Sequence, residues 1–310
     1  MLESISIVIP VYNGAATVGA VVTRVLQVLR GAQRRTEIIL VNDGSRDDSW
    51  ATIQALAQEY PEVAGIDLTR NYGQHNALLC GIRLAAHEVI VTLDDDLQQP
   101  PEEIPKLLAK LDEGFDVVYG TPEQERHGLA RNIGSRMTKA AFSAAMGADV
   151  ASKVSAFRAF RASLKPAFAE QQNPLLNIDV LLTWATTRIA AVRVTREPRR
   201  IGTSNYRIRS LVRHAMNMMT GFSVLPLQVA TLIGFLFTVF GLMVLAYVVG
   251  RYLISGDSVP GFPFLASIIA IFSGAQLFAL GIIGEYLGRM HMRTMNRPPY
   301  LVRTTTDGRR

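Results

Sequence analysis

The chain has 310 residues, of which 49% are hydrophobic and 19% are charged, and its net charge is +6. This balance excludes a disordered chain, a collagen-like repeat and a coiled coil, and it is more apolar than is usual for a soluble enzyme of this length. Residues 1–187 hold 17 basic and 22 acidic residues, so the positive charge lies further along the chain and does not indicate nucleic-acid binding. A single cysteine, Cys80, excludes an internal disulfide and a multi-cysteine zinc site, and indicates a reducing compartment.

Residues 1–120 alternate short β-branched runs with helical patterns, which predicts an α/β domain with a mostly parallel sheet covered by helices. The first apolar run ends at Pro10 and is too short for a secretory signal, so we interpret it as a buried strand. The expected strands are Ile5–Ile9, Glu37–Val41, Val63–Leu68, Glu88–Leu93 and Asp116–Tyr119. Ligands of open sheets of this kind bind beyond the carboxyl ends of the strands.

Polar residues follow four of these strands. They are Tyr12-Asn13, Asn42-Asp43, Arg70-Asn71 and Asp94-Asp95-Asp96-Leu97-Gln98. Three adjacent carboxylates repel one another unless a cation or solvent compensates them, and hard oxygen ligands suit Mg²⁺ or Mn²⁺, which would also bind a substrate's phosphates. The alternative is a solvated acidic loop that caps the helix beginning near Pro101.

The middle of the chain has a weaker pattern. Helical spacing recurs around Ile133–Met146, a short segment Phe157–Phe160 follows, and Val180–Trp184 has the composition of a buried segment. The region from Arg188 to Arg213 then contains eight arginines and one acid, Glu197. Such a basic collar fits anionic lipid head groups or a phosphate held at a membrane surface.

Two stretches near the C-terminus, 214–250 and 258–284, contain no Asp, Glu, Lys or Arg. Each exceeds the roughly 20 residues that cross a bilayer as a helix, which predicts membrane helices near 226–249 and 262–284. The link between them, Gly250–Asp257, holds one Arg and one Asp, whereas arginines flank the other ends. The positive-inside rule then predicts a multi-pass protein of the inner membrane with both termini cytoplasmic. The alternative is a hairpin buried in a large soluble core.

Four parts of the chain follow from these patterns. They are an α/β domain over 1–203, an interfacial amphipathic helix over 204–224, the two membrane helices within 225–288, and a basic cytoplasmic tail over 289–310.

Several motifs, in order, resemble those of glycosyltransferase family 2, and specifically of its polyprenyl-phosphate glycosyltransferases, which have a GT-A fold. They are Ile7–Asn13, Val41–Ser45, Arg70–His75, Asp94–Glu102 and, after the membrane helices, Gly281–Arg289. Each motif alone is weak, but their order and the C-terminal hairpin together extend the resemblance over nearly the whole chain.

The resemblance implies a site for a nucleotide sugar and for Mg²⁺ or Mn²⁺. The residues implied to bind the donor are Pro10, Tyr12, Asn13, Asp43, Asp94 and Asp95. The metal on the diphosphate would be held by Asp94, Asp96 and Gln98, where it neutralises charge on the leaving nucleoside diphosphate. For Asp43 the alternative is turn chemistry, because Asn-Asp-Gly-Ser forms a turn by itself.

The acceptor side is implied to involve Arg199, Arg200 and Ser204, in a loop that reaches the donor and acceptor phosphates. Arg199, with Asp94 and Asp96, makes up the expected catalytic set. The alternative for the two arginines is a contact with lipid head groups.

The chain departs from the family's pattern at three positions. Gly14 stands where the family commonly has an acid, Asn205 where it usually has Lys, and Ser152 where it has an acid proposed as a base or acceptor organiser. A phosphate monoester is largely ionised at pH 7, so attack on the anomeric carbon needs no strong base. Asp149 and Asp179 are the nearest other acids, and we expect both to be structural.

The sequence therefore predicts an inverting, metal-dependent glycosyltransferase that moves a sugar from a nucleotide sugar, with a UDP-sugar favoured, to undecaprenyl or another polyprenyl phosphate at the cytoplasmic face. Its product would serve envelope glycan or lipid modification. Two alternatives stay open, namely a catalytically silent membrane-attached scaffold that binds nucleotide sugars and a transferase acting on another lipid. Membrane lipid is an expected partner, nucleic acid is not, and a homo-oligomer stays open. We expect His75 to pack or hydrogen-bond, and Glu285 to pair with Arg289.

Overall fold

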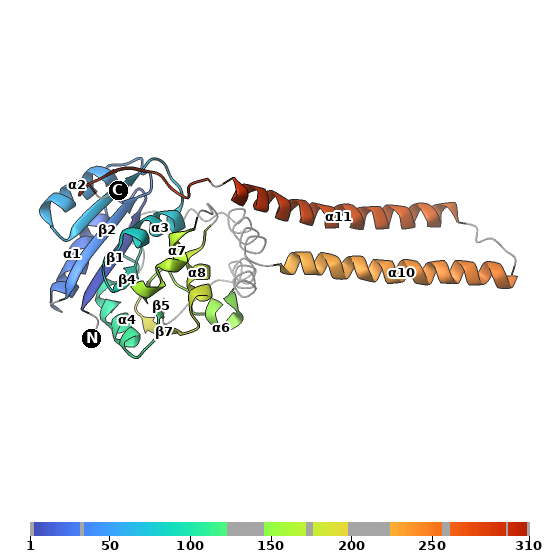
Figure 1. Ribbon diagram of the computed structural model, residues 1–310, viewed down its shortest axis with the longest axis horizontal. Coiled ribbons are helices and arrows are strands. Elements are labelled where there is room, and N and C mark those ends of the chain that lie inside the picture. The colour runs from blue at the N-terminus through green and yellow to red at the C-terminus, as the bar shows by residue number, and fades with distance from the viewer. Residues whose placement is uncertain are drawn as a thin grey trace.

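The computed structural model describes residues 3–31, 34–122, 146–171, 176–197, 224–255, 261–295 and 297–308. Figure 1 shows a layered α/β domain from which two long antiparallel helices project side by side. The chain returns from the second helix to the domain, so both ends of the chain lie there, far from the connection between the two helices.

The domain is built on an eight-stranded sheet with the order β7-β5-β6-β4-β1-β2-β3-β8. Its strands are β1 (Ser4–Val11), β2 (Arg35–Asn42), β3 (Val63–Leu68), β4 (Val89–Thr92), β5 (Val117–Pro122), β6 (Arg158–Arg161), β7 (Ile189–Val194) and β8 (Val302–Thr305). The strands β4, β1, β2 and β3 are mutually parallel, as are β5 and β7, whereas β6 and β8 run antiparallel to their neighbours. The predicted α/β class with a mostly parallel sheet is confirmed.

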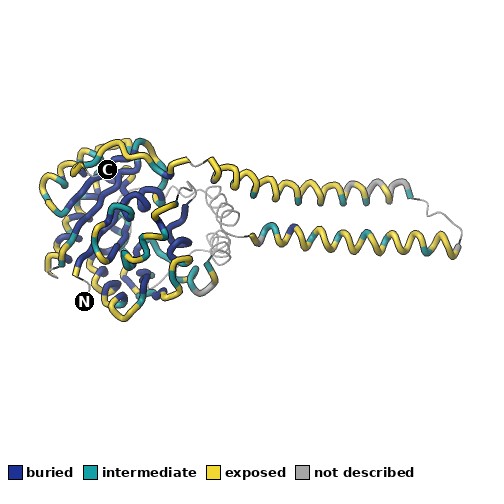
Figure 2. Tube along the Cα trace, viewed as in Figure 1, coloured by how far each residue is buried: buried dark blue, intermediate teal, exposed yellow. Residues whose placement is uncertain are grey.

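Helices cover both faces of this sheet because its strands are apolar on both faces. Ile5, Ile7 and Ile9 of β1 pack on one side of the sheet, and Val8 packs on the other. Figure 2 shows that the central strands are buried, whereas the two projecting helices are mostly exposed. The first side is covered by α1 (Val18–Gly31), α2 (Ser49–Glu59), the 3₁₀ turn η1 (Pro101–Glu103) and α4 (Ile104–Asp112). The second is covered by α3 (Gln74–Leu84), η2 (Ala162–Leu164), α7 (Pro166–Ala169) and α8 (Ile178–Ala185), and a short α6 spans Ala148–Ala151.

The register of the parallel strands brings their following loops together. Val11 at the end of β1 pairs with Asn42 at the end of β2, and Val8 of β1 pairs with Thr92 at the end of β4. The loops that begin at residues 12, 43 and 93 therefore leave the sheet on one side, at the carboxyl ends of the parallel strands, which we call the ligand-binding edge. Ligands of open parallel sheets bind at this edge.

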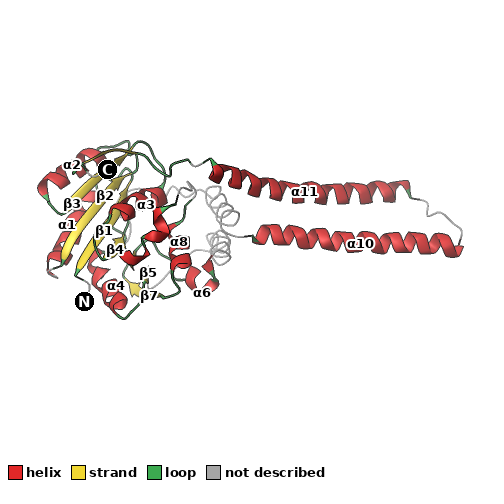
Figure 3. Cartoon of the chain, viewed as in Figure 1, coloured by secondary structure: helices red, strands yellow, loops and turns green. Residues whose placement is uncertain are grey.

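The two projecting helices are α10 (Leu225–Ser255) and α11 (Phe262–Thr294) (Figure 3). They contact each other through an edge-on pair of rings, Phe237 and Phe272, and Gly241 leaves room for the second ring. Large apolar side chains on both helices are exposed along most of their length.

Both helices are long and apolar enough to cross a membrane, over Pro226–Ile254 and Ile271–Met292. They agree in place with the predicted spans 226–249 and 262–284, and both helices continue past the predicted ends. The predicted pair of Glu285 and Arg289 forms, with 2.7 Å between Oε1 and Nη2. A surface this apolar on a helix pair that no other described segment covers fits a bilayer rather than water.

The structure differs from the expected basic tail over 289–310. Strand β8 joins the sheet antiparallel to β3, and the Gly65 amide donates a hydrogen bond to Thr306 Oγ1 at 2.8 Å. Arg303 forms an ion pair with the buried Asp67 at 3.1 Å. The segment therefore covers an edge of the sheet that would otherwise expose unpaired backbone groups.

Other expectations were met only in part. Phe157–Phe160 largely overlaps β6, whereas Trp184 at the end of the expected buried segment Val180–Trp184 is 63% exposed. Most of the helical pattern over 133–146 lies outside the described residues, as do residues 204–223 of the expected interfacial helix.

Candidate active site

The loop after β4 carries three adjacent carboxylates at the ligand-binding edge of the sheet. Asp94 is held by two amide side chains, because Gln74 Nε2 donates to its Oδ1 at 2.5 Å and Gln99 Nε2 donates to its Oδ2 at 3.1 Å. The Asp94 amide in turn donates to Gln99 Oε1 at 3.0 Å. Gln74 begins helix α3, so these contacts fix the carboxylate between the loop and that helix.

Asp96 is held by the residue two positions later. Both the backbone amide and the side-chain amide of Gln98 donate to it, at 3.1 Å and 2.5 Å. Between them Leu97 has a φ of 60°, in the left-handed region that residues with a Cβ rarely adopt. Such backbone strain is typical of sites whose surroundings impose a particular geometry.

Asp95 turns toward the loop after β1. Its Oδ2 is buried, has no hydrogen-bond partner among the described residues, and lies only 2.1 Å from where a Cβ at Gly14 would be. Gly14 is thus the residue that makes room for Asp95, which explains why this chain has no acid at position 14. A second carboxylate there would meet the first without any intervening group.

The three carboxylates carry more negative charge than their surroundings balance. Burial, and after it the charge of Asp96, raises the pKa of Asp94 to about 6. Burial, and after it the charges of Asp94 and Asp96, raises the pKa of Asp95 to about 7. A divalent cation would relieve both effects, and the donor set of carboxylate and amide oxygens is the one that Mg²⁺ and Mn²⁺ prefer.

The donor set therefore fits the metal that the sequence implies, although it does not enclose one. Among the described residues no three His, Cys, Asp or Glu side chains converge on one point. Ligands from the substrate and from water would have to complete the coordination shell, as is usual for Mg²⁺ at phosphate sites.

The loops after β1 and β2 are joined by reciprocal hydrogen bonds. Asn13, with a φ of 53°, donates its amide to Ser45 Oγ at 2.9 Å, and its Oδ1 accepts from the Arg46 amide at 2.9 Å. Tyr12 beside it is 46% exposed, which leaves its ring available to a ligand, whereas Pro10 is buried inside β1. Asn13 therefore fixes the place from which the Tyr12 ring projects.

Asp43 holds the loop after β3. Its two carboxylate oxygens accept hydrogen bonds from the backbone amides of Tyr72 and Gly73, at 2.7 Å and 2.9 Å. The pKa of Asp43 is raised, because the effect of burial is larger than the lowering effect of these two bonds. The next residue, Gly44, has a φ of 63° and approaches the Arg70 backbone so closely that no Cβ fits. Asp43 thus combines the turn chemistry weighed above with a position at the ligand-binding edge.

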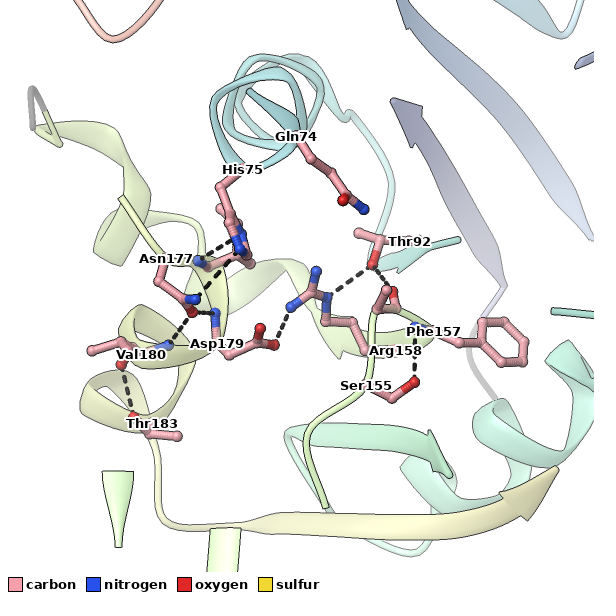
Figure 4. A network of polar contacts seen from close by, with 12 residues as sticks. Gln74, His75, Thr92, Ser155, Phe157, Arg158, Asn177, Asp179, Val180 and Thr183 are labelled. Carbon is pink, nitrogen blue, oxygen red and sulfur yellow. Dashed lines mark hydrogen bonds and ion pairs between the residues drawn. The ribbon is translucent and has the colours of Figure 1, made fainter. Parts of the chain in front are cut away.

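A buried network joins β6, β4, α8 and α3 (Figure 4), and its member Thr92 lies at the end of β4, just before the carboxylate loop. Arg158 of β6 is 1% exposed, forms an ion pair with Asp179 of α8, and donates from Nε to Thr92 Oγ1 at 2.9 Å. Helix α8 is capped by Asn177, and the Ile178 amide donates to His75 Nδ1 at 3.3 Å. The network ties α3, β4 and α8 together beneath Asp94.

Arg158, Gln74 and Arg196 were not among the predicted site residues. Arg158 falls within the segment Phe157–Phe160 and Gln74 within the motif Arg70–His75, which were the available signals for them, whereas Arg196 was one of eight arginines in the basic collar. Arg196 reaches the carboxylate loop, where it donates to Gln98 Oε1 from Nε at 3.1 Å and from Nη2 at 2.6 Å. The Glu197 amide donates a hydrogen bond to the Gln98 carbonyl, and the Glu197 carboxylate forms an ion pair with Arg24.

The remaining predicted residues are not brought to this loop by the described structure. Ser152 is exposed just after α6, and Asp149 lies within that helix. Arg199, Arg200 and Ser204 lie outside the described residues.

Comparisons with known proteins agree with this geometry. The family described as "Glycosyl transferase family 2" matches residues 6–165. An undecaprenyl-phosphate 4-deoxy-4-formamido-L-arabinose transferase of Shewanella sediminis (strain HAW-EB3) is 35% identical, over 99% of this chain and 94% of its own length. The protein of the same name from Pseudomonas paraeruginosa (strain DSM 24068 / PA7) is 33% identical, over 97% of this chain and 90% of its own length.

Solved structures show the same fold. Glucosyl-3-phosphoglycerate synthase from Mycobacterium tuberculosis, crystallised with Mn²⁺ and UDP-glucose, superposes with a TM-score of 0.52 at 18% identity, over 70% of this chain and 77% of its own. Its complex with UDP gives a TM-score of 0.51 at 18% identity, over 70% and 79% of the two chains. The predicted GT-A-type fold is confirmed.

Proposed function

Because this chain belongs to glycosyl transferase family 2, we propose that it transfers one sugar from a nucleotide sugar to a polyprenyl phosphate at a membrane surface. The observation that carries the proposal is the juxtaposition of the Asp94–Asp96 loop, the Asp43-held loop and the exposed Tyr12 ring at one edge of a parallel sheet. The full-length similarity to undecaprenyl-phosphate transferases supports the lipid acceptor.

The nucleotide part of the donor would lie between the loops after β1 and β2. The exposed Tyr12 ring offers an apolar face for a base or ribose, and Asn13 holds that ring's loop through its bonds to residues 45 and 46. Asp43 keeps one lone pair free on each carboxylate oxygen after accepting its two backbone bonds, so it can accept from the nucleoside as well. Asp95, which packs against Gly14, and Pro10, which is buried within β1, would close this side of the pocket.

The diphosphate would lie over Asp94 and Asp96. A Mg²⁺ or Mn²⁺ ion bound by these residues and Gln98 would neutralise charge on the leaving nucleoside diphosphate. The Mn²⁺ and UDP-glucose in the similarly folded synthase support this placement. Gln74 and Gln99 orient Asp94, and the buried Arg158 places a positive charge behind it.

The transfer itself requires little chemistry from side chains. An oxygen of the lipid phosphate attacks the anomeric carbon, the bond from that carbon to the diphosphate oxygen breaks, and the configuration inverts. The phosphate is already largely ionised at pH 7, which agrees with the exposed Ser152 where a base is expected. Arg199, Arg200 and Ser204 remain the proposed acceptor-phosphate contacts, with Arg199 in the catalytic set.

The acceptor's lipid chain fixes where the reaction occurs. We propose that α10 and α11 cross the bilayer, with the catalytic domain and β8 on the cytoplasmic side, where nucleotide sugars are made. The domain and the C-terminal segment must share a side, because both belong to one sheet.

A direct test uses membranes that contain the full chain, undecaprenyl phosphate and a panel of labelled UDP-, GDP- and dTDP-sugars. We expect a labelled lipid product that runs as a polyprenyl-monophosphate sugar on thin-layer plates, from one donor of the panel. Asp96→Ala should abolish the product, and so should excess EDTA. A protein that binds the nucleotide but gives no product with any donor would be the silent scaffold instead.

A further inference from the structure

Arg196 forms hydrogen bonds with Gln98 Oε1, the oxygen atom that the proposed metal site would need. Its guanidinium donates two hydrogen bonds to Gln98 Oε1, at 3.1 Å and 2.6 Å, while Gln98 Nε2 donates to Asp96 Oδ2 at 2.5 Å. The amide of Gln98 is thus oriented with its oxygen toward a cation and its nitrogen toward the carboxylate.

A metal ion bound by Asp96 and Gln98 would demand the opposite orientation. An amide NH₂ group has no lone pair to offer, so Gln98 can ligate only through Oε1. Its side chain would have to turn until Oε1 faces the same space as the Asp96 carboxylate, and both bonds from Arg196 would then break. The positive charge of the Arg196 guanidinium, which lies within hydrogen-bond distance of Gln98 Oε1, would also repel a divalent cation bound to that oxygen.

The surroundings of Arg196 allow its side chain to move away from Gln98 while its backbone stays in place. Its side chain is exposed and, within the described residues, it forms no ion pair. The next residue is anchored instead, since the Glu197 amide donates to the Gln98 carbonyl at 3.0 Å and Glu197 pairs with Arg24 at 2.8 Å. The contact of Arg196 with Gln98 is therefore not required to hold this segment.

We propose that Arg196 is a positioning residue that competes with the divalent cation for Gln98, and so makes metal binding depend on the nucleotide. The inference rests on the proposed metal site. When the metal binds alone, the two bonds of Arg196 are lost without replacement. When a nucleoside diphosphate binds with the metal, its phosphate oxygens offer the freed guanidinium a charged acceptor in place of Gln98. Metal and nucleotide then strengthen each other's binding by the same factor.

The test measures Mn²⁺ affinity, without turnover. The full chain, purified in detergent and stripped of metal, is titrated with Mn²⁺ with and without UDP, and free Mn²⁺ is read from its electron paramagnetic resonance signal. The variants are Arg196→Ala, Asp96→Asn and, as a control with the same charge change, Arg193→Ala on the exposed side of β7.

Arg196→Ala should bind Mn²⁺ alone roughly three- to tenfold more tightly than the wild type, because two hydrogen bonds to Gln98 no longer compete. UDP should then improve its Mn²⁺ affinity less than it does for the wild type. Arg193→Ala should match the wild type, and Asp96→Asn should bind Mn²⁺ weakly. General damage to the site would lower the affinity of Arg196→Ala, which is the opposite sign.

The outcomes separate the two proposals. Equal Mn²⁺ affinities in the wild type and Arg196→Ala, with weak binding by Asp96→Asn, would refute the role of Arg196 and leave the metal site standing. A loss of affinity in Arg196→Ala, or an equal gain in Arg193→Ala, would refute it too. If the wild type bound no Mn²⁺ even with UDP, both the metal site and the inference would fail.

Discussion

At the scale of single residues, the carboxylate loop concentrates negative charge that the groups around it do not balance. Asp95 shows this most clearly, because one of its oxygens is buried without a hydrogen-bond partner among the described residues and its pKa is raised to about 7. The pKa of Asp94 is raised to about 6 for the same reasons, burial first and a neighbouring carboxylate second. A carboxyl group whose pKa is higher in the folded than in the unfolded protein binds protons more tightly when folded.

This sign gives a prediction for the metal-free protein. As pH rises from about 4 to about 7, Asp94 and Asp95 lose protons in the fold against an unfavourable field, so the free energy of unfolding should fall across this window. Thermal unfolding in EDTA should show a melting temperature several degrees lower at pH 8 than at pH 5. Asp95→Asn should remove much of that difference, and added Mn²⁺ should stabilise the wild type more at pH 8.

The opposite trend would contradict the prediction. If EDTA-treated protein became more stable between pH 5 and pH 8, and Asp95→Asn did not change the slope, the carboxylates would be compensated by groups within the fold. A cation would then not be needed to hold the loop.

What the sequence reveals of the site depends on how far apart the partners lie along the chain. The run Asp94–Asp96 and the neighbouring Gln98 are local, so a cluster of carboxylate and amide oxygens was predictable from their order, and its role as a metal site stays a prediction. The contact of Gln98 with Arg196 joins residues 98 positions apart, and nothing in the spacing indicates it. The fit between Asp95 and Gly14 is similar, since the missing acid at position 14 gains its meaning only from the loop packed against it.

At the scale of elements, strands with apolar runs were predictable and strands defined by pairing were not. Ile5–Ile9 and Val63–Leu68 are buried, the first of them is mostly β-branched, and both expectations match β1 and β3 closely. Strand β8 has the sequence Val-Arg-Thr-Thr and is mostly exposed, so it has no buried face to give a pattern. Its pairing with β3 depends on the path of the intervening hairpin, which local sequence does not encode.

The element α8 gives a second prediction, because Asp179 is the buried partner of Arg158. Asp179→Asn would leave the Arg158 charge buried and uncompensated, which should destabilise the protein by about 3–5 kcal/mol. Glu62→Gln, which weakens the pair between the partly exposed Glu62 and the exposed Arg30, should cost about 1 kcal/mol or less. Thermal unfolding of both variants beside the wild type measures the difference.

The same variant tests whether Asp179 replaces the acid missing at position 152. If Asp179→Asn kept the wild-type melting temperature and nucleotide affinity but lost turnover, Asp179 would act in the chemistry rather than in the fold. Ser152→Ala should retain most activity in either case.

At the scale of the whole molecule, one sheet contains segments from both ends of the chain, and the pair of long apolar helices lies between these segments in the sequence. Residues 4–122 and Val302–Thr305 belong to one domain, while α10 and α11 extend from it as an antiparallel pair (Figure 1). If the helices cross the bilayer, the domain and the C-terminal strand must lie on one side, and the ends of α10 and α11 at Ser255 and Phe262 on the other. The arginines that flank the domain end of the helices predict, by the positive-inside rule, that the domain lies on the cytoplasmic side.

This arrangement can be tested by thiol labelling in intact cells. Cys80 is buried, and Cys80→Ala removes it from the background. A cysteine at Ser255, at the far end of α10, should react with an impermeant maleimide added outside, whereas a cysteine at the exposed Thr304 of β8 should react only after the cells are opened. Labelling of both sites from outside would show that the helices do not span the membrane, and the reverse pattern would place the donor site away from cytoplasmic nucleotide sugars. Because β8 pairs with β3 in the same sheet, the Thr304 result reports the side of the catalytic domain as well as that of the C-terminus.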